Sequence, residues 1–89
     1  MAWRVELSTL AQKNIDQLDP LIARCILSFL HERVAPLDDP RSIGEALKGS
    51  RLGEFWKYRV GDYRVISRIE DGALTILVIR TGNRREAYR

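Results

Sequence analysis

Apolar and polar residues alternate or recur along the chain in patterns that predict strands and helices. Residues 3–7 alternate apolar and charged side chains, which is the period of a half-buried strand. Apolar residues then fall on one side of a helix expected over about 9–18, with Ser8 or Thr9 as its N-terminal cap. The first part of the chain is therefore predicted to be a strand followed by a short helix.

A second helix is predicted to start at Asp19 and Pro20. Asp is favoured at the cap, and Pro is favoured at the first helical position, where its missing N–H leaves no hydrogen bond unmade. Apolar residues recur every four positions from there to Val34, so the helix is expected to end near residues 35–36. Cys25 lies in this apolar stripe and is expected to be a small buried hydrophobe.

The second half of the chain reads as a loop followed by three strands. Residues 36–53 contain Pro and several Gly residues, which predicts a loop with at most one helical turn around 43–47. The strands are expected at 55–60, 63–69 and 74–81. The last of them is apolar on both faces, so we expect it to be the central strand.

Together these elements predict an α+β fold in one small domain spanning residues 1–89. A chain of 89 residues has enough apolar material for one core. Two helices joined by a short turn form an antiparallel hairpin, whose apolar side needs a sheet to cover it. The expected architecture is an N-terminal strand and an antiparallel helix hairpin packed on an antiparallel sheet, in the order β-α-α-β-β-β.

Gly61 and Asp62 are the only residues between the first two strands of the second half, and such a pair predicts a tight hairpin turn. The turn fixes which residues face each other across the hairpin. Val60 is then expected opposite Tyr63. The same register gives the pairs Arg59 with Arg64, Tyr58 with Val65, Lys57 with Ile66, and Trp56 with Ser67.

Side chains alternate across a strand, so this register predicts one cationic face and one apolar face. Lys57, Arg59 and Arg64 share the cationic face, with Arg68 further along it. The other face carries Trp56, Tyr58, Val60 and Val65, which can meet the helices. Like charges directly opposite each other destabilise a sheet by roughly 0.2–1 kcal/mol, and an anion between the two arginines would reverse that effect. Alternatively, the arginines splay into solvent or pair with Glu54, Asp62 or Glu70.

Charge is distributed unevenly along the chain. Residues 1–47 carry five Lys or Arg and seven Asp or Glu, whereas residues 48–89 carry ten and five. Of the 15 basic residues, 12 are arginine, whose planar fork binds phosphate through two donors and keeps its proton. A polyanionic partner is therefore expected for the second half, although arginines that only keep a surface soluble would give the same composition.

Several classes of protein conflict with the composition. One cysteine cannot form a disulfide framework, and the N-terminus lacks the apolar run of a secretion signal. No segment approaches the roughly 20 apolar residues that a membrane-spanning helix needs. One His and one Cys make a poor metal-ligand set. We therefore expect a soluble, cytoplasmic protein without a metal or another cofactor.

Three segments carry a family resemblance: Leu-Lys-Gly at 47–49, the strand-turn-strand segment 55–66, and Gly-Asn-Arg-Arg-Glu-Ala-Tyr at 82–88. In them the chain resembles the RelE toxins of bacterial and archaeal toxin-antitoxin modules. The resemblance implies an mRNA endoribonuclease that cuts codons in the ribosomal A site. It also implies attack by an RNA 2′-hydroxyl without a metal, and silencing by a cognate RelB-like antitoxin.

The resemblance also assigns functional residues by position. As catalytic residues it implies Lys57, Arg59, Arg64, Arg84 and Tyr88. Arg64 and Lys57 would grip the scissile phosphate, Arg84 would lie near the leaving oxygen, and Tyr88 would stack on a base or help to move the attacking proton. Peripheral RNA contacts are expected from Lys48, Arg51, Arg68, Arg85 and Arg89.

Two other functions remain open from the sequence. A ParE-type toxin shares the fold but binds DNA gyrase, and it would not need the five aligned residues of catalytic type. A noncatalytic RNA-binding module would shift RNA in a gel without cutting it. In either toxin class we expect an antitoxin whose amphipathic helix covers the toxin and whose acidic residues approach the arginines.

Overall fold

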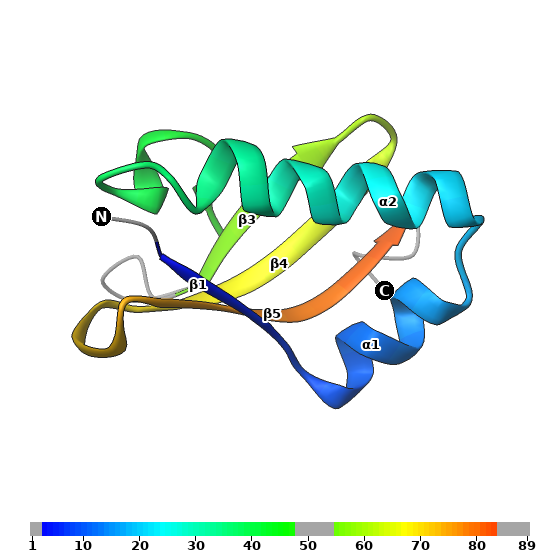
Figure 1. Ribbon diagram of the computed structural model, residues 1–89, viewed down its shortest axis with the longest axis horizontal. Helices are drawn as coiled ribbons and strands as arrows, with labels where there is room; N and C mark the ends of the chain where they lie inside the picture. The colour runs from blue at the N-terminus through cyan, green and yellow to red at the C-terminus, as the bar shows by residue number, and fades with distance from the viewer. Residues whose placement is uncertain (1–2, 48–54, 84–89) are drawn as a thin grey trace.

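The computed structural model describes residues 3–47 and 55–83, which form a layer of two helices on a five-stranded sheet (Figure 1). The elements in order are β1 (Arg4–Leu7), α1 (Thr9–Asp16), α2 (Pro20–Phe29), β2 (Glu45–Ala46), β3 (Phe55–Val60), β4 (Tyr63–Glu70) and β5 (Thr75–Asn83). A π-helical turn, Leu30–Val34, extends α2, and 3-10 turns occupy Pro40–Ser42 and Asp71–Ala73. The predicted α+β class is confirmed.

Both predicted helix starts are confirmed by their caps. The Ser8 hydroxyl accepts a hydrogen bond from the Ala11 N–H at 3.0 Å. The Asp19 carboxylate accepts one from the Leu21 N–H at 2.9 Å, and Pro20 occupies the first position of α2. Caps of this kind satisfy N–H groups that lack a partner within the helix, and they typically stabilise it by about 1 kcal/mol.

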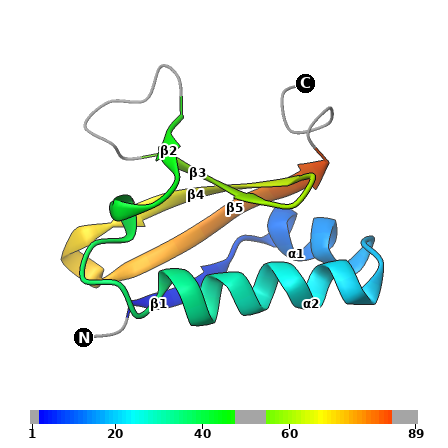
Figure 2. The ribbon, with the colours of Figure 1, turned by 90° about the horizontal axis from the view of Figure 1, so that it is seen from above.

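The helices run in opposing directions along the sheet, and both lie against the same face of it (Figure 2). Ile26, Leu30 and Val34, which follow at intervals of four, are fully buried there. From the sheet, Tyr58 and Val65 are fully buried in the same core, as the alternation of β3 and β4 predicts. This apolar layer fixes which side of the sheet is left for other chemistry.

Cys25 is exposed, so the prediction that it is a buried hydrophobe is wrong. The buried side of α2 is marked by Ile26, with Ile22 packed against the same core, and Leu30 of the π-helical turn continues it. Because each residue turns an α-helix by about 100°, Cys25 lies beside that stripe instead of within it.

The strand order is β1-β5-β4-β3-β2, and the sheet is mixed. The pairs of β3 with β4 and of β4 with β5 are antiparallel as predicted. The strand β2, which was not predicted, also pairs antiparallel with β3, whereas β1 pairs in parallel with β5. The prediction that the last strand is central is wrong, because β4 occupies the middle of the order. The apolar character of β5 has another cause: it is an inner strand flanked by β1 and β4, and β2 extends the sheet on the far side of β3.

Residues 43–47 form no helical turn, and the predicted loop contains a short strand that the sequence did not indicate. Glu45 and Ala46 form β2 instead, with Glu45 opposite Lys57 across the pair with β3. The indole N–H of Trp56 donates a hydrogen bond to the Ile43 carbonyl at 2.7 Å, which holds this segment against the sheet. A tertiary contact of this kind outweighs the small local preference for a helix.

The hairpin of β3 and β4 has the predicted register. Val60 faces Tyr63 across the turn at Gly61 and Asp62. Gly61 has a φ of +60°, a left-handed conformation that glycine adopts without strain. The four further predicted pairs, Arg59 with Arg64, Tyr58 with Val65, Lys57 with Ile66, and Trp56 with Ser67, are all present.

Candidate functional site

The face of the sheet turned away from the helices, called here the open face, carries a hollow of about 200 Å³. It lies where β2, β3 and β4 adjoin. Its lining consists of Gly44, Glu45, Lys57, Arg59 and Arg64, and we call it the cationic hollow. The prediction that Lys57, Arg59 and Arg64 share one face is therefore confirmed, and the structure brings them around one space.

Arg64 is the most unusual member of the hollow because only 4% of it is exposed. Its Nη1 atom is buried and has no hydrogen-bond partner among the described residues. An arginine stays protonated at all accessible pH values, and a buried charged donor without an acceptor is costly. A guanidinium in this setting favours the approach of an anion with several acceptor oxygens.

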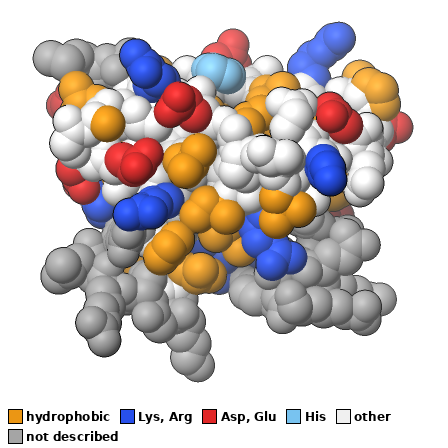
Figure 3. Space-filling model, turned by 90° about the horizontal axis from the view of Figure 1, so that it is seen from below, with side chains coloured by type: hydrophobic (Ala, Val, Ile, Leu, Met, Phe, Trp, Pro, Cys, Tyr) orange, Lys and Arg blue, Asp and Glu red, His pale blue; other side chains and the backbone are white. Residues whose placement is uncertain are grey.

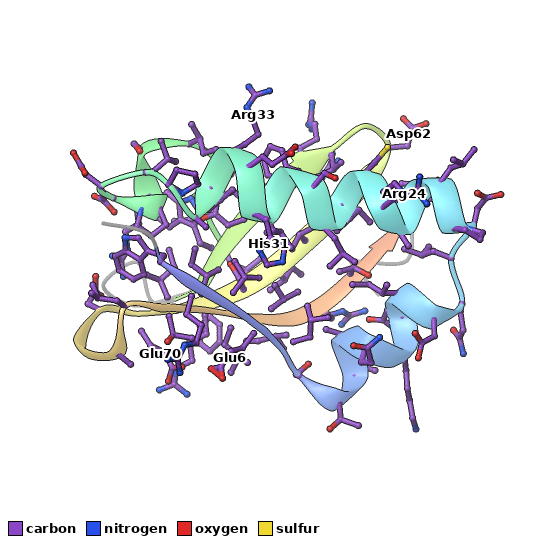
Figure 4. All side chains as sticks on the ribbon, in the orientation of Figure 1. Glu6, Arg24, His31, Arg33, Asp62 and Glu70 are labelled. Atoms are coloured by element: carbon purple, nitrogen blue, oxygen red, sulfur yellow. The ribbon has the colours of Figure 1, made fainter. Side chains whose placement is uncertain are left out.

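Arg59 lies directly opposite Arg64 on the neighbouring strand and is exposed. Within the described residues neither arginine forms an ion pair. Asp62 lies at the tip of the hairpin and points away from the sheet (Figure 4). The alternative in which Asp62 or Glu70 neutralises the two arginines does not occur in this part of the chain, and Glu54 lies outside the described residues.

Lys57 approaches the hollow from the same face of β3. Its ammonium Nζ lies 3.2 Å from a carboxylate oxygen of Glu45, and the exposed fractions of the two side chains are 16% and 68%. Lys57 is thus held in place by β2, and Glu45 introduces one carboxylate among the cations. Sequence reasoning missed Glu45, because its segment is predicted as a loop or a helical turn.

Gly44 allows β2 to come this close to β3. Its φ is +81°, a conformation that side chains with a Cβ rarely adopt. A Cβ built there would lie 2.6 Å from the Lys57 carbonyl oxygen and 2.8 Å from Nε1 of Trp56. Gly44 is therefore the residue that sets the position of Glu45 relative to Lys57.

A β-bulge in β5 adds Arg80 to the open face. Ser67 pairs with Val78, but the preceding residue, Ile66, pairs with Arg80, so Ile79 is the extra residue. Without that extra residue Arg80 would pair with Val65 and face the helices. Sequence reasoning missed Arg80 for this reason, because a bulge inside a continuous apolar strand leaves no signal in the pattern of residues.

Arg68 lies on the open face at the end far from the hairpin turn, opposite Leu77, so the prediction of its face is confirmed. Glu6 and Glu70 also belong to that end of the sheet (Figure 4). Charge therefore changes along the open face: the described acids Glu6 and Glu70 lie away from the hairpin, whereas Arg59 and Arg64 lie beside its turn.

Six of the predicted functional residues lie outside the described residues and stay predictions: Lys48, Arg51, Arg84, Arg85, Tyr88 and Arg89. Within residues 3–47 and 55–83, no group of three or more His, Cys, Asp or Glu side chains is arranged to hold a metal ion. In the same part of the chain, no helix is long and apolar enough to cross a membrane.

Tyr58 packs on the helix side and has a structural role. Its hydroxyl donates a hydrogen bond to the Pro40 carbonyl at 2.6 Å, and its ring contacts that of Phe29 edge to face at 6.1 Å between centroids. Burial raises the pKa of the Tyr58 phenol well above its usual range. The phenol therefore stays neutral and bonded to Pro40 on the helix side, so Tyr58 supplies packing beneath the hollow.

The sequence matches the family described as ParE toxin of type II toxin-antitoxin system, parDE, over residues 5–88. It is similar to Toxin RelG of Mycobacterium tuberculosis, with 28% identity over 89 residues that cover 100% of this chain and 99% of the relative. Toxin RelE of the same organism is 28% identical over 87 residues, covering 98% of this chain and 87% of the relative.

Solved structures of toxins share the fold. The RelBE2 toxin-antitoxin complex of Mycobacterium tuberculosis contains a chain that aligns with a TM-score of 0.80 and 24% identity, covering 93% of this chain and 92% of that chain. A mutant of the Escherichia coli toxin RelE in the free state aligns with a TM-score of 0.79 and 19% identity, covering 99% of this chain and 90% of that chain. At such identities the two structures establish the arrangement of elements.

The family match covers nearly the whole chain, and the two curated relatives are both toxins. The resemblance to RelE toxins, predicted from the segments at 47–49, 55–66 and 82–88, is confirmed. The chain therefore belongs to the family of ParE toxins of type II toxin-antitoxin systems, and it is a toxin of the RelE type.

Proposed function

We propose that this toxin is a ribosome-dependent endoribonuclease that cuts mRNA codons in the A site and so inhibits translation. The observation that carries the proposal is the buried guanidinium of Arg64, which lines one hollow with Lys57 and Arg59. Within residues 3–47 and 55–83 its Nη1 has no hydrogen-bond partner. A phosphate of the RNA backbone would supply the missing acceptors. The relatives named RelG and RelE support a RelE-type activity for this hollow.

The proposed reaction is attack of a 2′-hydroxyl on the adjacent phosphate. The transition state is a phosphorane with additional negative charge, and cations fixed around it before the reaction stabilise that charge. Arg64 and Lys57 would grip the scissile phosphate, with Arg59 beside them. Arg84 would lie near the leaving oxygen, and Tyr88 would stack on a base or help to move a proton. Because the nucleophile belongs to the RNA, the reaction needs no metal.

Other cations would bind the rest of the RNA. Lys48, Arg51, Arg68, Arg85 and Arg89 are proposed as peripheral phosphate contacts, and Arg80 joins them because the bulge in β5 places it on the open face. Each such contact adds salt-dependent affinity without reading the sequence. We propose that residues 1–89 form one toxin domain that acts in the cytoplasm, where ribosomes and mRNA are found.

A cognate RelB-like antitoxin is the proposed protein partner. Solved structures similar in fold include complexes of RelE with RelB from Escherichia coli and Pyrococcus horikoshii. Hydrophobic side chains gather on the side of the molecule where β1 and α1 lie (Figure 3), and the outer edge of β1 has no neighbouring strand within the described sheet. An amphipathic antitoxin segment could cover such apolar groups while its acidic residues neutralise the arginines.

Ribosomes stalled with a defined codon in the A site provide the test. Purified toxin is expected to cut the A-site codon, as mapped by primer extension. An mRNA with 2′-deoxyribose at the three A-site nucleotides is expected to stay intact, because the nucleophile is missing. Equal cutting of both mRNAs would contradict the proposed chemistry.

The matched family is described as ParE toxin, and this observation favours a second candidate, a toxin that binds DNA gyrase. A supercoiling assay with purified gyrase separates the two functions. Inhibited supercoiling together with intact mRNA on stalled ribosomes would establish the ParE-type activity. A shift of RNA in a gel, with neither cleavage nor gyrase inhibition, would instead indicate a noncatalytic RNA-binding module.

A further inference from the structure

Large apolar side chains share the open face with the arginines. Phe55 precedes Lys57 by two residues on β3 and therefore emerges on the same side of the sheet. Leu77 of β5 pairs with Arg68 and lies on that side too. Both apolar residues are partly exposed, and neither belongs to the hydrophobic core that the described residues form with the helices. An aromatic ring outside the core and beside several cations points to a ligand.

Phe55 lies next to the cationic hollow. Residues two apart on a strand are separated by about 7 Å between Cα atoms, so Phe55 begins one such step from Lys57, which lines the hollow. Across the pair with β4, Phe55 faces Arg68, which is exposed. The ring is thereby flanked by one cation along its own strand and by another across the sheet.

A base of single-stranded RNA matches this arrangement. Unpaired bases stack on aromatic side chains and on the planes of arginine guanidinium groups. Sheets that bind single-stranded RNA present aromatic rings on the face that no helix covers. When a phosphate occupies the hollow, the base of an adjoining nucleotide extends over the neighbouring surface, where Phe55 lies. The cations attract the RNA backbone, and the ring supplies a contact that the cations cannot make.

We propose that Phe55 is a stacking platform for an unpaired base next to the scissile phosphate, with Arg68 beside it. This inference rests on the proposed endoribonuclease function and adds to it a contact with a base. Because every base has an aromatic face, the contact orients the RNA and does not read its sequence. A held base also fixes the adjoining ribose, and a 2′-hydroxyl fixed in line with the phosphate attacks faster than a mobile one.

A purely structural role for Phe55 makes a different prediction. Aromatic residues are favoured in strands, and the pair with Arg68 could serve only to stabilise the sheet. Replacing Phe55 would then change the cleavage rate by the same factor whichever bases the mRNA carries. If Phe55 stacks on a base, the effect of the replacement depends on the presence of that base. Removing the ring from the toxin and the base from the RNA, separately and together, distinguishes the two roles.

The experiment measures cleavage on stalled ribosomes at subsaturating toxin, with mRNAs that carry an abasic ribose at each A-site position, or at the nucleotide after it, in turn. An abasic nucleotide keeps its 2′-hydroxyl and its phosphates, so the chemistry stays possible. At one position, loss of the base is expected to slow the wild type about 5- to 150-fold, the range for one stacked base. Phe55→Ala is expected to be slower by a similar factor on the intact mRNA, and to lose nothing further when that base is absent.

Two further variants complete the test. Phe55→Leu keeps apolar bulk in the strand without an aromatic face and is expected to behave like Phe55→Ala, whereas Phe55→Trp is expected to retain the response to the missing base. Leu21→Ala is the matched control, because Leu21 is a large apolar residue of α2 that is 70% exposed. This variant is expected to cut every mRNA like the wild type.

The inference and the proposed function can fail separately. If Phe55→Ala and Phe55→Leu differ from the wild type by the same factor on every mRNA, or do not differ at all, the stacking role is overturned while the endoribonuclease stands. If the wild type does not cut the intact mRNA, the proposed function fails, and the role of Phe55 fails with it.

Discussion

Arg59 and Arg64 face each other directly across the hairpin of β3 and β4, and neither forms an ion pair within the described residues. Two like charges in this arrangement oppose folding, and Arg64 is also almost fully buried. Such a pair is expected where a site for an anion is kept at the expense of stability.

Arg59→Thr is expected to stabilise the free toxin. Removing one of two facing cations should raise the free energy of unfolding by about 0.2–1 kcal/mol, measured by urea denaturation. Arg4→Thr on β1 is the control for the strand preference of Thr, since Arg4 is exposed and faces Thr75. A gain of the same size in both variants would assign the effect to strand preference instead of charge repulsion.

Inorganic phosphate is expected to raise the thermal unfolding midpoint of the toxin. A ligand that binds the folded state alone stabilises it by RT ln(1 + [L]/Kd), so the midpoint should rise with the logarithm of the phosphate concentration. The reference is sodium chloride at the same ionic strength. The rise should be smaller in Arg59→Thr, and equal midpoints in phosphate and chloride would contradict the anion site.

Gly44→Ala is expected to destabilise the toxin by about 1–3 kcal/mol, because Ala disfavours the positive φ and its Cβ would press on the Lys57 carbonyl. Gly61→Ala is the matched control: its φ is also positive, but nothing lies within 4 Å of the added Cβ. The difference between the two variants in the free energy of unfolding, measured by urea denaturation, therefore reports how tightly β2 packs on β3. Equal losses would mean that this packing contributes little.

Stability is expected to fall at high pH because of Tyr58. Burial raises its pKa in the folded state above the value of about 10 in the unfolded chain. The contribution of the Tyr58 phenol to the free energy of unfolding is therefore fully present below about pH 10. It is lost as the pH rises toward the pKa of the phenol in the folded state. Tyr58→Phe should show a smaller loss above pH 10 in urea denaturation, while costing about 1 kcal/mol at pH 7 through its hydrogen bond to Pro40. Parallel pH curves for the two proteins would contradict the assignment.

The hairpin and its cationic face could be predicted from the sequence because local rules determine them. Two residues of turn type, Gly61 and Asp62, fix the register, and alternation then assigns every side chain of β3 and β4 to a face. The helix starts at Ser8 and Asp19 could also be predicted, because a cap is a local feature of the sequence.

The parts that the sequence did not reveal depend on contacts between distant segments. Nothing in the sequence near β1 indicates that it pairs in parallel with β5. The apolar pattern of β5 therefore predicts a central strand, although β4 is the central one. β2 exists because Trp56 and Gly44 hold a short segment on β3, and the position of Glu45 follows from it. The bulge that turns Arg80 to the open face is likewise a property of the paired sheet.

The most direct measurement of the central claim is the single-turnover rate of mRNA cleavage on stalled ribosomes for the wild type and Arg64→Ala. Loss of one preorganised donor to the transition state predicts a rate about 10²- to 10³-fold lower. Arg33→Ala, at an exposed position on the helix side (Figure 4), is expected to cut at the wild-type rate, and circular dichroism checks that Arg64→Ala is folded. Cleavage by folded Arg64→Ala at the wild-type rate would contradict the claim that the cationic hollow holds the scissile phosphate.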